Sequence, residues 1–259
     1  MKKTLVLKCG GSILNQLSSE FFRSVKQMAD ENWNIVIVHG GGPDINSLLS
    51  ELNIESEFFE GQRKTTPEIL EVVEMTLAGK LNKKLVRKLS EAQLNAVGIT
   101  GQDGGLLTAE FLSREHLGFV GRVTSVQTEI LQMLLDKGFI PVVAPLARTE
   151  DYQALNVNAD LAASAIARAL QADKLLYVTD VKGILQEKKL VDEINPEEIN
   201  GLIEKGVITG GMIPKAKAAS GSLSEHLKQV MIVSGKQTFF KEGKFIGTKV
   251  CKQKEAAEK

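Results

Sequence analysis

Short apolar runs alternate along the chain with longer segments in which apolar residues recur every three or four positions. The short runs predict buried strands at residues 5–7, 35–38, 96–99, 140–144, 175–178 and 230–233. The longer segments predict helices at residues 21–32, 43–52, 67–77, 82–93, 124–137, 159–170, 196–205 and 215–223. Strands that alternate with helices favour parallel pairing, with helices on both faces of the sheet. We therefore predict an α/β fold, a three-layer αβα sandwich around a mainly parallel central sheet.

Residues 184–194 depart from this alternation. Their polar centre, residues 186–189, lies between apolar flanks, which predicts a β-hairpin. We place a boundary between two lobes shortly before this segment, near Ala172. Residues 1–172 then form an N-lobe and residues 173–259 form a C-lobe.

Length and charge narrow the class of protein. A chain of 259 residues suits one large α/β unit or two closely packed lobes. The 32 Lys and Arg residues balance the 32 Asp and Glu residues, and no polybasic run supplies the electrostatic footprint of nucleic-acid binding. No apolar run approaches the roughly 20 residues that span a bilayer. We expect neither nucleic acid nor a membrane as a partner.

The cysteines and the first apolar run bear on location. Cys9 and Cys251 lie near opposite ends of the chain, which is neither a disulfide framework nor a metal-binding spacing. Lys8 and the two glycines at residues 10 and 11 cut the first apolar run short of a signal-peptide core. We expect a cytoplasmic protein with no metal site built from side chains alone.

Glycine-rich turns follow the first two predicted strands. Residues 8–12 read Lys-Cys-Gly-Gly-Ser, and residues 39–43 read His-Gly-Gly-Gly-Pro. Glycine lets backbone N–H groups approach an anion, and Pro43 suits the first position of a helix whose N-terminus favours negative charge. One such turn alone is an ordinary strand-to-helix connection. Two of them, one with Lys8, favour an anion site at the carboxyl ends of the strands.

Familiar nucleotide and hydrolase motifs are absent from the sequence. No Gly-x-x-x-x-Gly-Lys-Ser/Thr occurs, and Ile45 stands where Gly40 and Gly42 would require a third glycine for Gly-x-Gly-x-x-Gly. His-Gly-Gly-Gly also forms oxyanion holes in esterases, but the Gly-x-Ser-x-Gly nucleophile motif is missing. A serine hydrolase is therefore disfavoured.

Two polar segments add candidate ligands for a carboxylate. In the loop of residues 61–67, Arg63 has the planar fork that binds a carboxylate through two hydrogen bonds, although a lone loop arginine is usually solvated. Residues 156–160 read Asn-Val-Asn-Ala-Asp and open a predicted helix. An Asn N-cap and an Asp in the first turn explain this segment structurally. Its place after the fourth strand, on the side of the glycine turns, favours a functional role.

Two later segments suit phosphate as well as ordinary turns. Residues 179–184, Thr-Asp-Val-Lys-Gly-Ile, follow the fifth strand. Residues 210–215, Gly-Gly-Met-Ile-Pro-Lys, open a late helix and again combine glycines with a lysine, Lys215.

The ordered set of these segments resembles the amino-acid kinase family over nearly the whole chain. The set comprises Lys-x-Gly-Gly at residue 8, His-Gly-Gly-Gly-Pro at 39, Gly-Gln-Arg at 61, Asn-Val-Asn-Ala-Asp at 156 and Gly-Gly-Met-x-x-Lys at 210. The Gly-Gln-Arg and Asn-Val-Asn-Ala-Asp pair is similar to the members, of the kind found in Gram-positive bacteria, that phosphorylate N-acetyl-L-glutamate. The resemblance implies a carbamate kinase-like fold, ATP as co-substrate, and Mg²⁺ bound mainly through phosphate oxygens and water.

The resemblance also implies residue roles. The reaction would involve Lys8, Lys215, Asp160 and Gly11, with the lysines on the transferring phosphoryl group and Asp160 orienting both of them. N-acetyl-L-glutamate would be held by Gly41, Gly42, Arg63, Asn156 and Asn158. ATP would be held by Gly10, Thr179, Asp180, Gly183 and Met212.

The expected chemistry needs no general base. A carboxylate with a pKa of about 4.3 is already ionised at neutral pH, so what opposes phosphoryl transfer is the repulsion between two anions. Lysines and backbone N–H groups offset that repulsion. We expect His39, His116 and His226 to be structural or exposed, with His39 orienting its glycine turn.

The resemblance carries further expectations and leaves alternatives. Arginine-inhibited members carry an extra N-terminal helix that builds a hexamer, whereas the first strand here starts close to Met1. We therefore predict a homodimer with little or no arginine feedback. The alternatives are another acid kinase of this fold, such as one for an aminoadipate derivative, and a non-catalytic sensor of nucleotide or amino acid.

Overall fold

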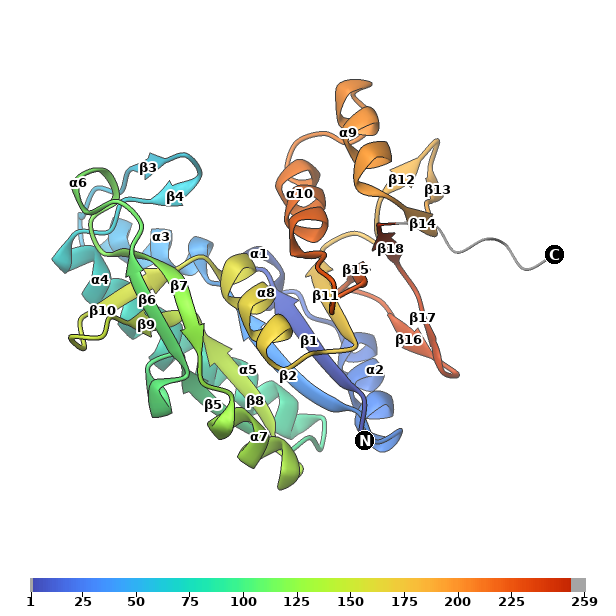
Figure 1. The fold of residues 1–259 in the computed structure, drawn as a ribbon, viewed down its shortest axis with the longest axis horizontal. Coiled ribbons are helices and arrows are strands. Elements are labelled where there is room, and N and C mark those ends of the chain that lie inside the picture. The colour runs from blue at the N-terminus through green and yellow to red at the C-terminus, as the bar shows by residue number, and fades with distance from the viewer. Residues whose placement is uncertain (1, 253–259) are drawn as a thin grey trace.

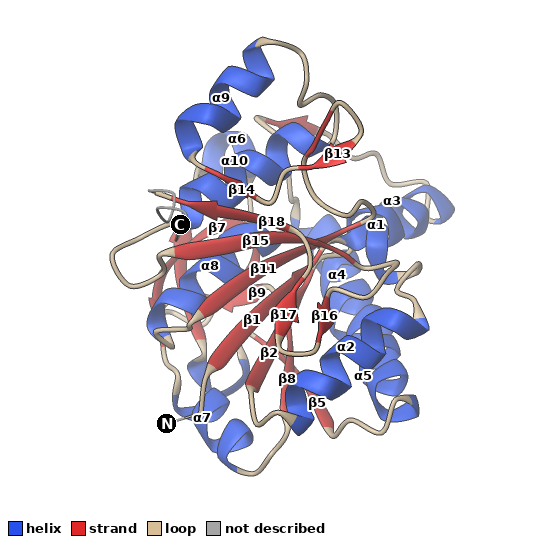
Figure 2. Ribbon diagram, turned by 90° about the vertical axis from the view of Figure 1, so that its right-hand side faces the viewer, coloured by secondary structure: helices blue, strands red, loops and turns tan. Residues whose placement is uncertain are grey.

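All six predicted strands lie in one eight-stranded sheet of the computed structural model, which describes residues 2–252 (Figure 2). They are β1 (Thr4–Cys9), β2 (Asn34–His39), β5 (Ala96–Thr100), β8 (Ile140–Ala144), β11 (Lys174–Thr179) and β15 (Gln229–Ser234). The strand order is β14-β18-β15-β11-β1-β2-β8-β5, where β14 (Glu193–Ile194) and β18 (Thr248–Cys251) form one edge. Every pairing among the six is parallel, and β18 pairs antiparallel with β15. The predicted, mainly parallel sheet is confirmed.

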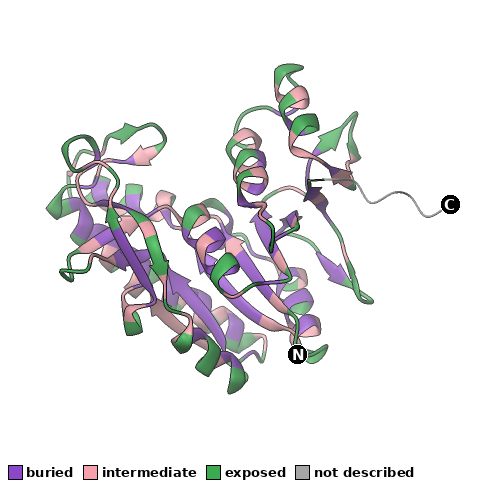
Figure 3. Cartoon of the chain, in the orientation of Figure 1, coloured by how far each residue is buried: buried purple, intermediate pink, exposed green. Residues whose placement is uncertain are grey.

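Helices cover both faces of the sheet, which gives the three predicted layers (Figure 1). One face packs against α2 (Ser19–Asp30), α3 (Gly42–Glu51), α4 (Pro67–Glu74), the π-helix η1 (Met75–Leu81) and α5 (Asn82–Glu91). The other packs against α7 (Glu129–Asp136), α8 (Ala159–Ala169), α9 (Pro196–Glu204) and α10 (Met212–Ser222). Alternation along β1 sends Leu5 and Leu7 to the first core and Val6 to the second. The central strands are buried as a result (Figure 3).

The prediction of one helix over residues 124–137 is wrong in its first part. Residues Val120–Val126 form strand β7, and α7 begins only at Glu129. Strand β7 pairs with β6 (Leu107–Phe111) and β10 (Ala154–Val157), and β9 (Leu146–Arg148) completes a small closed barrel. Valine and threonine fit a pleated surface better than a helix, and pairing with distant strands decides the conformation here. No expected element covered β6, β9 or β10.

The remaining elements are short. The predicted hairpin is present as β12 (Leu185–Gln186) and β13 (Lys189–Leu190), and the two residues between the strands, Glu187 and Lys188, have positive φ as a tight hairpin turn requires. Further short elements are α1 (Gly11–Leu14), β3 (Phe58–Phe59), β4 (Gln62–Arg63), the 3₁₀ helix η2 (Asp103–Gly105), α6 (Arg114–Leu117), β16 (Phe240–Lys241) and β17 (Lys244–Phe245).

The sheet runs without a break through both predicted lobes. The proposed boundary after residue 172 falls immediately before β11, which pairs along its length with β1 of the N-lobe. Contacts also cross the boundary elsewhere, because Ser24 in α2 accepts a hydrogen bond from the backbone N–H of Phe239. Within residues 2–252, no helix is both long and apolar enough to span a membrane.

Candidate active site

The two glycine turns meet at the carboxyl ends of β1 and β2. These strands are parallel neighbours with Cys9 opposite His39, so the chain turns away from both at the same edge of the sheet. A Cβ atom added to Gly11 would lie 2.8 Å from the backbone nitrogen of Gly41 and 2.8 Å from that of Gly42. Only glycine permits this approach, which gathers backbone N–H groups from two turns into one small space.

A buried polar network fixes the second turn. His39 is fully buried, and its Nδ1 atom lies 3.0 Å from the Gly40 carbonyl oxygen, to which it donates as the Nδ1–H tautomer. The amide of Asn82 lies 3.3 Å from Nε2 and also donates to the Val142 carbonyl in β8. Burial lowers the pKa of His39 to about 4, so the imidazole is neutral and structural. The expected role of His39 in orienting its turn fits this geometry.

A cavity of about 210 Å³ opens beside the glycine turns. Its walls come from both turns, the β3–β4 hairpin, the barrel and the start of α8, which are distant in sequence. Of the predicted residues it is lined by Gly11, Gly41, Gly42, Arg63, Asn156, Asn158 and Asp160. The structure thus brings together every residue predicted for the acid substrate, together with two of those predicted for the reaction.

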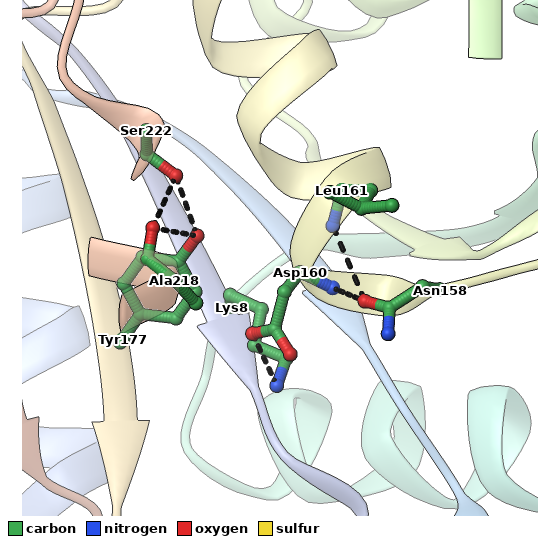
Figure 4. Close-up of polar contacts among 7 residues, drawn as sticks. All are labelled: Lys8, Asn158, Asp160, Leu161, Tyr177, Ala218 and Ser222. Carbon is green, nitrogen blue, oxygen red and sulfur yellow. Dashed lines mark hydrogen bonds and ion pairs between the residues drawn. The ribbon is translucent and has the colours of Figure 1, made fainter. Parts of the chain in front are cut away.

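Lys8 does not line this cavity itself, but it forms an ion pair with Asp160, which does (Figure 4). The Nζ atom of Lys8 lies 2.7 Å from Oδ1 of Asp160, and the Lys8 side chain is only 14% exposed. Asp160 is the second residue of α8, where a carboxylate also complements the helix dipole. The first turn of α8 therefore positions the carboxylate of Asp160 next to Lys8 of β1.

The two asparagines of the same segment have different partners. Asn158 caps α8, since its Oδ1 atom accepts from the N–H groups of Asp160 and Leu161, as the structural interpretation predicted. Asn156 donates through Nδ2 to the hydroxyl of Thr65, 3.2 Å away. Both side chains line the cavity.

Arg63 is a buried cation at the far wall of the cavity. It is 7% exposed, and its guanidinium donates to Asn46, 2.6 Å away, and to the Ser56 hydroxyl. Its Cζ atom lies 4.7 Å from the centroid of the Phe58 ring. Among residues 2–252, no carboxylate lies within ion-pair distance of Arg63, and burial lowers its pKa. A buried guanidinium with only neutral partners suits an incoming carboxylate.

Lys215 lies in α10 and pairs with a different carboxylate from that of Lys8. Its Nζ atom lies 2.9 Å from Oδ1 of Asp180, which follows β11 directly. Strand β11 is the parallel neighbour of β1, so both lysines occupy the carboxyl edge of the sheet. We expected Asp160 to orient both lysines, but in the structure Asp160 contacts Lys8, whereas Lys215 contacts Asp180.

The other residues predicted for ATP lie at or after the carboxyl ends of β1 and β11, or at the start of α10. Gly10 is the N-cap of α1, and Met212 begins α10. The Thr179 hydroxyl bonds the backbone of Val181. A Cβ atom on Gly183 would lie 2.5 Å from Oγ1 of Thr248, so this glycine is needed for packing. None of these four lines the 210 Å³ cavity.

Sequence reasoning missed the residues that hold the predicted ones in place. Asn46 and Ser56 fix the guanidinium of Arg63, Thr65 fixes Asn156, and Asn82 fixes His39. The only sequence signal was polarity at positions flanking a motif, as for Thr65 beside the Gly-Gln-Arg segment. Polar residues are common in helices and loops that have no role in a site, so the sequence pattern alone does not identify these four as site residues.

Taken together, the site offers hydrogen-bond donors to two anionic groups. The cavity lining contains the Arg63 guanidinium and the two glycine turns, and Lys8 lies next to this lining through its ion pair with Asp160. Such an arrangement suits a short diacid with one carboxylate held next to a phosphate.

Comparison with known proteins agrees with this geometry. The sequence model of the amino acid kinase family matches residues 3–234. The acetylglutamate kinase of Bacillus licheniformis is 53% identical over 256 residues, covering 99% of each chain. The solved structure of smu.665 from Streptococcus mutans has a TM-score of 0.85 at 31% identity, covering 98% of this chain and 100% of that one. Giardia carbamate kinase, at 19% identity and a TM-score of 0.70, covering 98% of this chain and 100% of its own, shares the fold. The chain therefore belongs to the amino acid kinase family.

Proposed function

We propose that the chain transfers the γ-phosphoryl group of ATP to the γ-carboxylate of N-acetyl-L-glutamate, giving N-acetyl-L-glutamyl 5-phosphate and ADP in the second step of arginine biosynthesis. The observation that carries this proposal is the cavity between Arg63 and the glycine turns, which suits a molecule with a carboxylate at each end. The similarity to a Bacillus acetylglutamate kinase, 53% identical along 99% of the chain, supports the choice of acid.

The acid lies across the cavity in this proposal. Arg63 holds the α-carboxylate through two N–H groups, and Asn156 holds the acetamido end. The γ-carboxylate then points toward Gly11, Gly41 and Gly42, whose N–H groups orient it. Support comes from the burial of Arg63 beside neutral partners only, and from the convergence of all these residues on one cavity.

Transfer proceeds by displacement at phosphorus. A γ-carboxylate oxygen forms a bond to the γ-phosphorus while the bond to the bridging β,γ-oxygen breaks, and ADP leaves with that electron pair. Lys8 and Lys215 neutralise the charge that spreads over the phosphoryl oxygens, and Asp160 keeps Lys8 in place. No proton has to be removed from the acid, so no general base takes part.

ATP occupies the C-lobe side of the same edge in this proposal. Gly10, Thr179, Asp180, Gly183 and Met212 surround its phosphates and nucleoside. The residues 2–252 hold no cluster of three or more His, Cys, Asp or Glu side chains suited to a metal ion. Mg²⁺ would therefore arrive with the phosphates and keep much of its water, supplying further positive charge to the transferring group.

We further propose that the enzyme works as a homodimer in the cytoplasm, with little or no arginine feedback. Sedimentation velocity gives the oligomeric state directly. A hexamer, or strong inhibition by millimolar arginine, contradicts this part of the proposal without touching the reaction.

A panel of acids tests the substrate. ADP formation is measured by a coupled assay with N-acetyl-L-glutamate, glutamate, aspartate and N-acetyl-L-aminoadipate. We expect N-acetyl-L-glutamate to have the highest kcat/KM, by at least about tenfold, since one extra methylene is worth about 10- to 200-fold. A preference for the aminoadipate derivative would identify the chain as an acid kinase of the other kind, and no turnover with any acid would favour a sensor.

A further inference from the structure

Tyr177 lies directly beside Lys8 in the central sheet (Figure 4). In the parallel pairing of β1 with β11, Lys8 is opposite Tyr177, so the two side chains project from the same face. The Nζ atom of Lys8 lies 6.0 Å from the centroid of the tyrosine ring, within reach of a cation–π interaction. Tyr177 is 2% exposed, so its ring is a fixed wall for the lysine.

The hydroxyl of Tyr177 binds α10. It lies 2.8 Å from Oγ of Ser222, which itself donates to the Ala218 carbonyl 2.9 Å away. The tyrosine hydroxyl also lies 3.5 Å from the Ala218 carbonyl oxygen, so either hydroxyl can donate in the bond between Tyr177 and Ser222. Ser222 and Ala218 both belong to α10, so this buried hydrogen bond joins the strand beside Lys8 to that helix.

Helix α10 also carries Lys215. Lys215 and Ser222 are seven residues apart, which is about two helical turns, so they share one face of the helix. Near its start α10 is held by the exposed ion pair of Lys215 with Asp180, and at its end by the buried bond of Ser222 with Tyr177. Only the second attachment is protected from solvent.

We infer that Tyr177 is a positioning residue that sets Lys215 relative to Lys8, with its ring beside one lysine and its hydroxyl on the helix that carries the other. The inference rests on the proposed function for the roles of the two lysines. Two ammonium groups must meet one phosphoryl group, and a misplacement of about 1 Å costs about 10²-fold in rate. Tyr177 itself touches no reacting atom.

Kinetics of three variants test the inference. Tyr177→Phe keeps the ring and removes one hydroxyl of this hydrogen bond, and Ser222→Ala removes the other. The matched control is Ser24→Ala, because Ser24 is equally buried and likewise donates to the carbonyl four residues before it, but lies in α2. Each variant is assayed for kcat and for the KM of N-acetyl-L-glutamate, and its unfolding temperature is measured.

We expect Tyr177→Phe and Ser222→Ala each to lower kcat by about 5- to 30-fold, with the KM of the acid within about twofold of wild type. The double variant should lose no more than the worse single variant, since both remove one bond. Ser24→Ala should keep its kcat. If all three variants lose thermal stability alike and Tyr177→Phe keeps wild-type kcat, the tyrosine is merely structural and the inference fails.

A measurement that needs no substrate separates this inference from the proposed function. Trace acetylation followed by mass spectrometry reports the reactivity of each lysine. Tyr177→Leu removes the ring, so Lys8 should label at least about threefold faster, while exposed Lys137 should not change. If the wild-type protein turns over no acid, the proposed function fails, and the labelling experiment alone then tests whether Tyr177 packs against Lys8. If Lys8 is acetylated at the same rate in Tyr177→Leu as in the wild-type protein, the Tyr177 ring does not shield Lys8 and the inference fails.

Discussion

The ammonium group of Lys215 lies 2.9 Å from the carboxylate of Asp180, and not beside Asp160, which holds Lys8 at 2.7 Å. The hydrogen bond from Lys215 lowers the pKa of Asp180 below its ordinary value, so this carboxylate is ionised at neutral pH. Each lysine thus has its own counter-ion. We expect Lys215 to exchange Asp180 for a phosphate oxygen when ATP binds.

The two aspartates should therefore differ when they are neutralised. Asp160→Asn removes the counter-ion of Lys8 at the cavity, and we expect kcat to fall at least about tenfold because Lys8 is no longer held in position. Asp180→Asn frees Lys215 from a partner that it leaves when ATP binds, so kcat should change by less than about threefold, and the loss of a residue that holds ATP should appear in the KM of ATP instead. Steady-state kinetics of both variants give the comparison. Equal losses would mean that the two carboxylates act alike.

Lys8→Ala should remove charge stabilisation from the transition state. We expect kcat to fall by about 10²- to 10³-fold, with the KM for ATP changed only modestly. Lys26→Ala is the control, because Lys26 is an exposed lysine on α2 that also pairs with an aspartate. Near-normal turnover of the Lys8 variant would refute the role given to this residue.

Arg63→Ala should chiefly weaken binding of the acid. We expect the KM of N-acetyl-L-glutamate to rise by about 10- to 100-fold with a smaller change in kcat. Arg63→Lys should not restore it, since an ammonium group lacks the planar fork. Arg23→Ala, at a side chain that is 73% exposed, serves as the control. A KM unaffected by both Arg63 substitutions would exclude contact with the substrate.

The fold was predictable to the extent that it follows from periodicity. The six central strands are short, continuous apolar runs flanked by helices, and local sequence specifies them. The barrel strand β7 mixes valines with Arg122, Thr124 and Ser125. It owes its conformation to pairing with β6 and β10, so single-sequence periodicity mistook part of it for helix. The periodicity of a single sequence carries no information about which distant segments pair with each other.

Some parts of the candidate site were likewise predictable from the sequence, and others were not. The glycine turns around Gly11 and Gly41 were predictable from the sequence, because only glycine allows the two backbone segments to come this close together. The pairing of Lys215 with Asp180 was not, because it depends on how α10 packs across β11. The role of Tyr177 was hidden for the same reason, since a tyrosine in a buried strand reads as ordinary core.

Gly11→Ala tests the contact between the two turns. The added Cβ would lie 2.8 Å from two backbone nitrogens, so one turn must move, and we expect kcat to fall by at least about 10²-fold. Gly201→Ala is the matched control, because a Cβ there meets nothing within 4 Å and the residue lies within helix α9. That variant should keep its activity and gain up to about 1 kcal/mol of stability. Full activity of Gly11→Ala would show that the turns do not need this approach.

Buried His39 should make stability depend on pH. Its pKa is about 4 in the folded protein and near 6.5 in the unfolded chain, so its contribution is complete above pH 6.5 and is lost as the pH falls through about 4. The loss amounts to about 3 kcal/mol at most. Urea unfolding at pH 7.5, 5.5 and 4.5 measures it, and His39→Gln should show a shallower dependence. Identical pH profiles for the two proteins would contradict a buried neutral imidazole.

In the proposed reaction, one cavity brings a carboxylate and the γ-phosphoryl group of ATP together. Hydroxylamine traps an acyl phosphate as a hydroxamate, so the most direct measurement is the ATP-dependent formation of hydroxamate from N-acetyl-L-glutamate, followed by mass spectrometry. We predict one N-acetylglutamyl γ-hydroxamate per ADP with the wild-type protein, and about 10²-fold less with Lys8→Ala. ADP formation without hydroxamate, or equal hydroxamate from both proteins, would contradict the account.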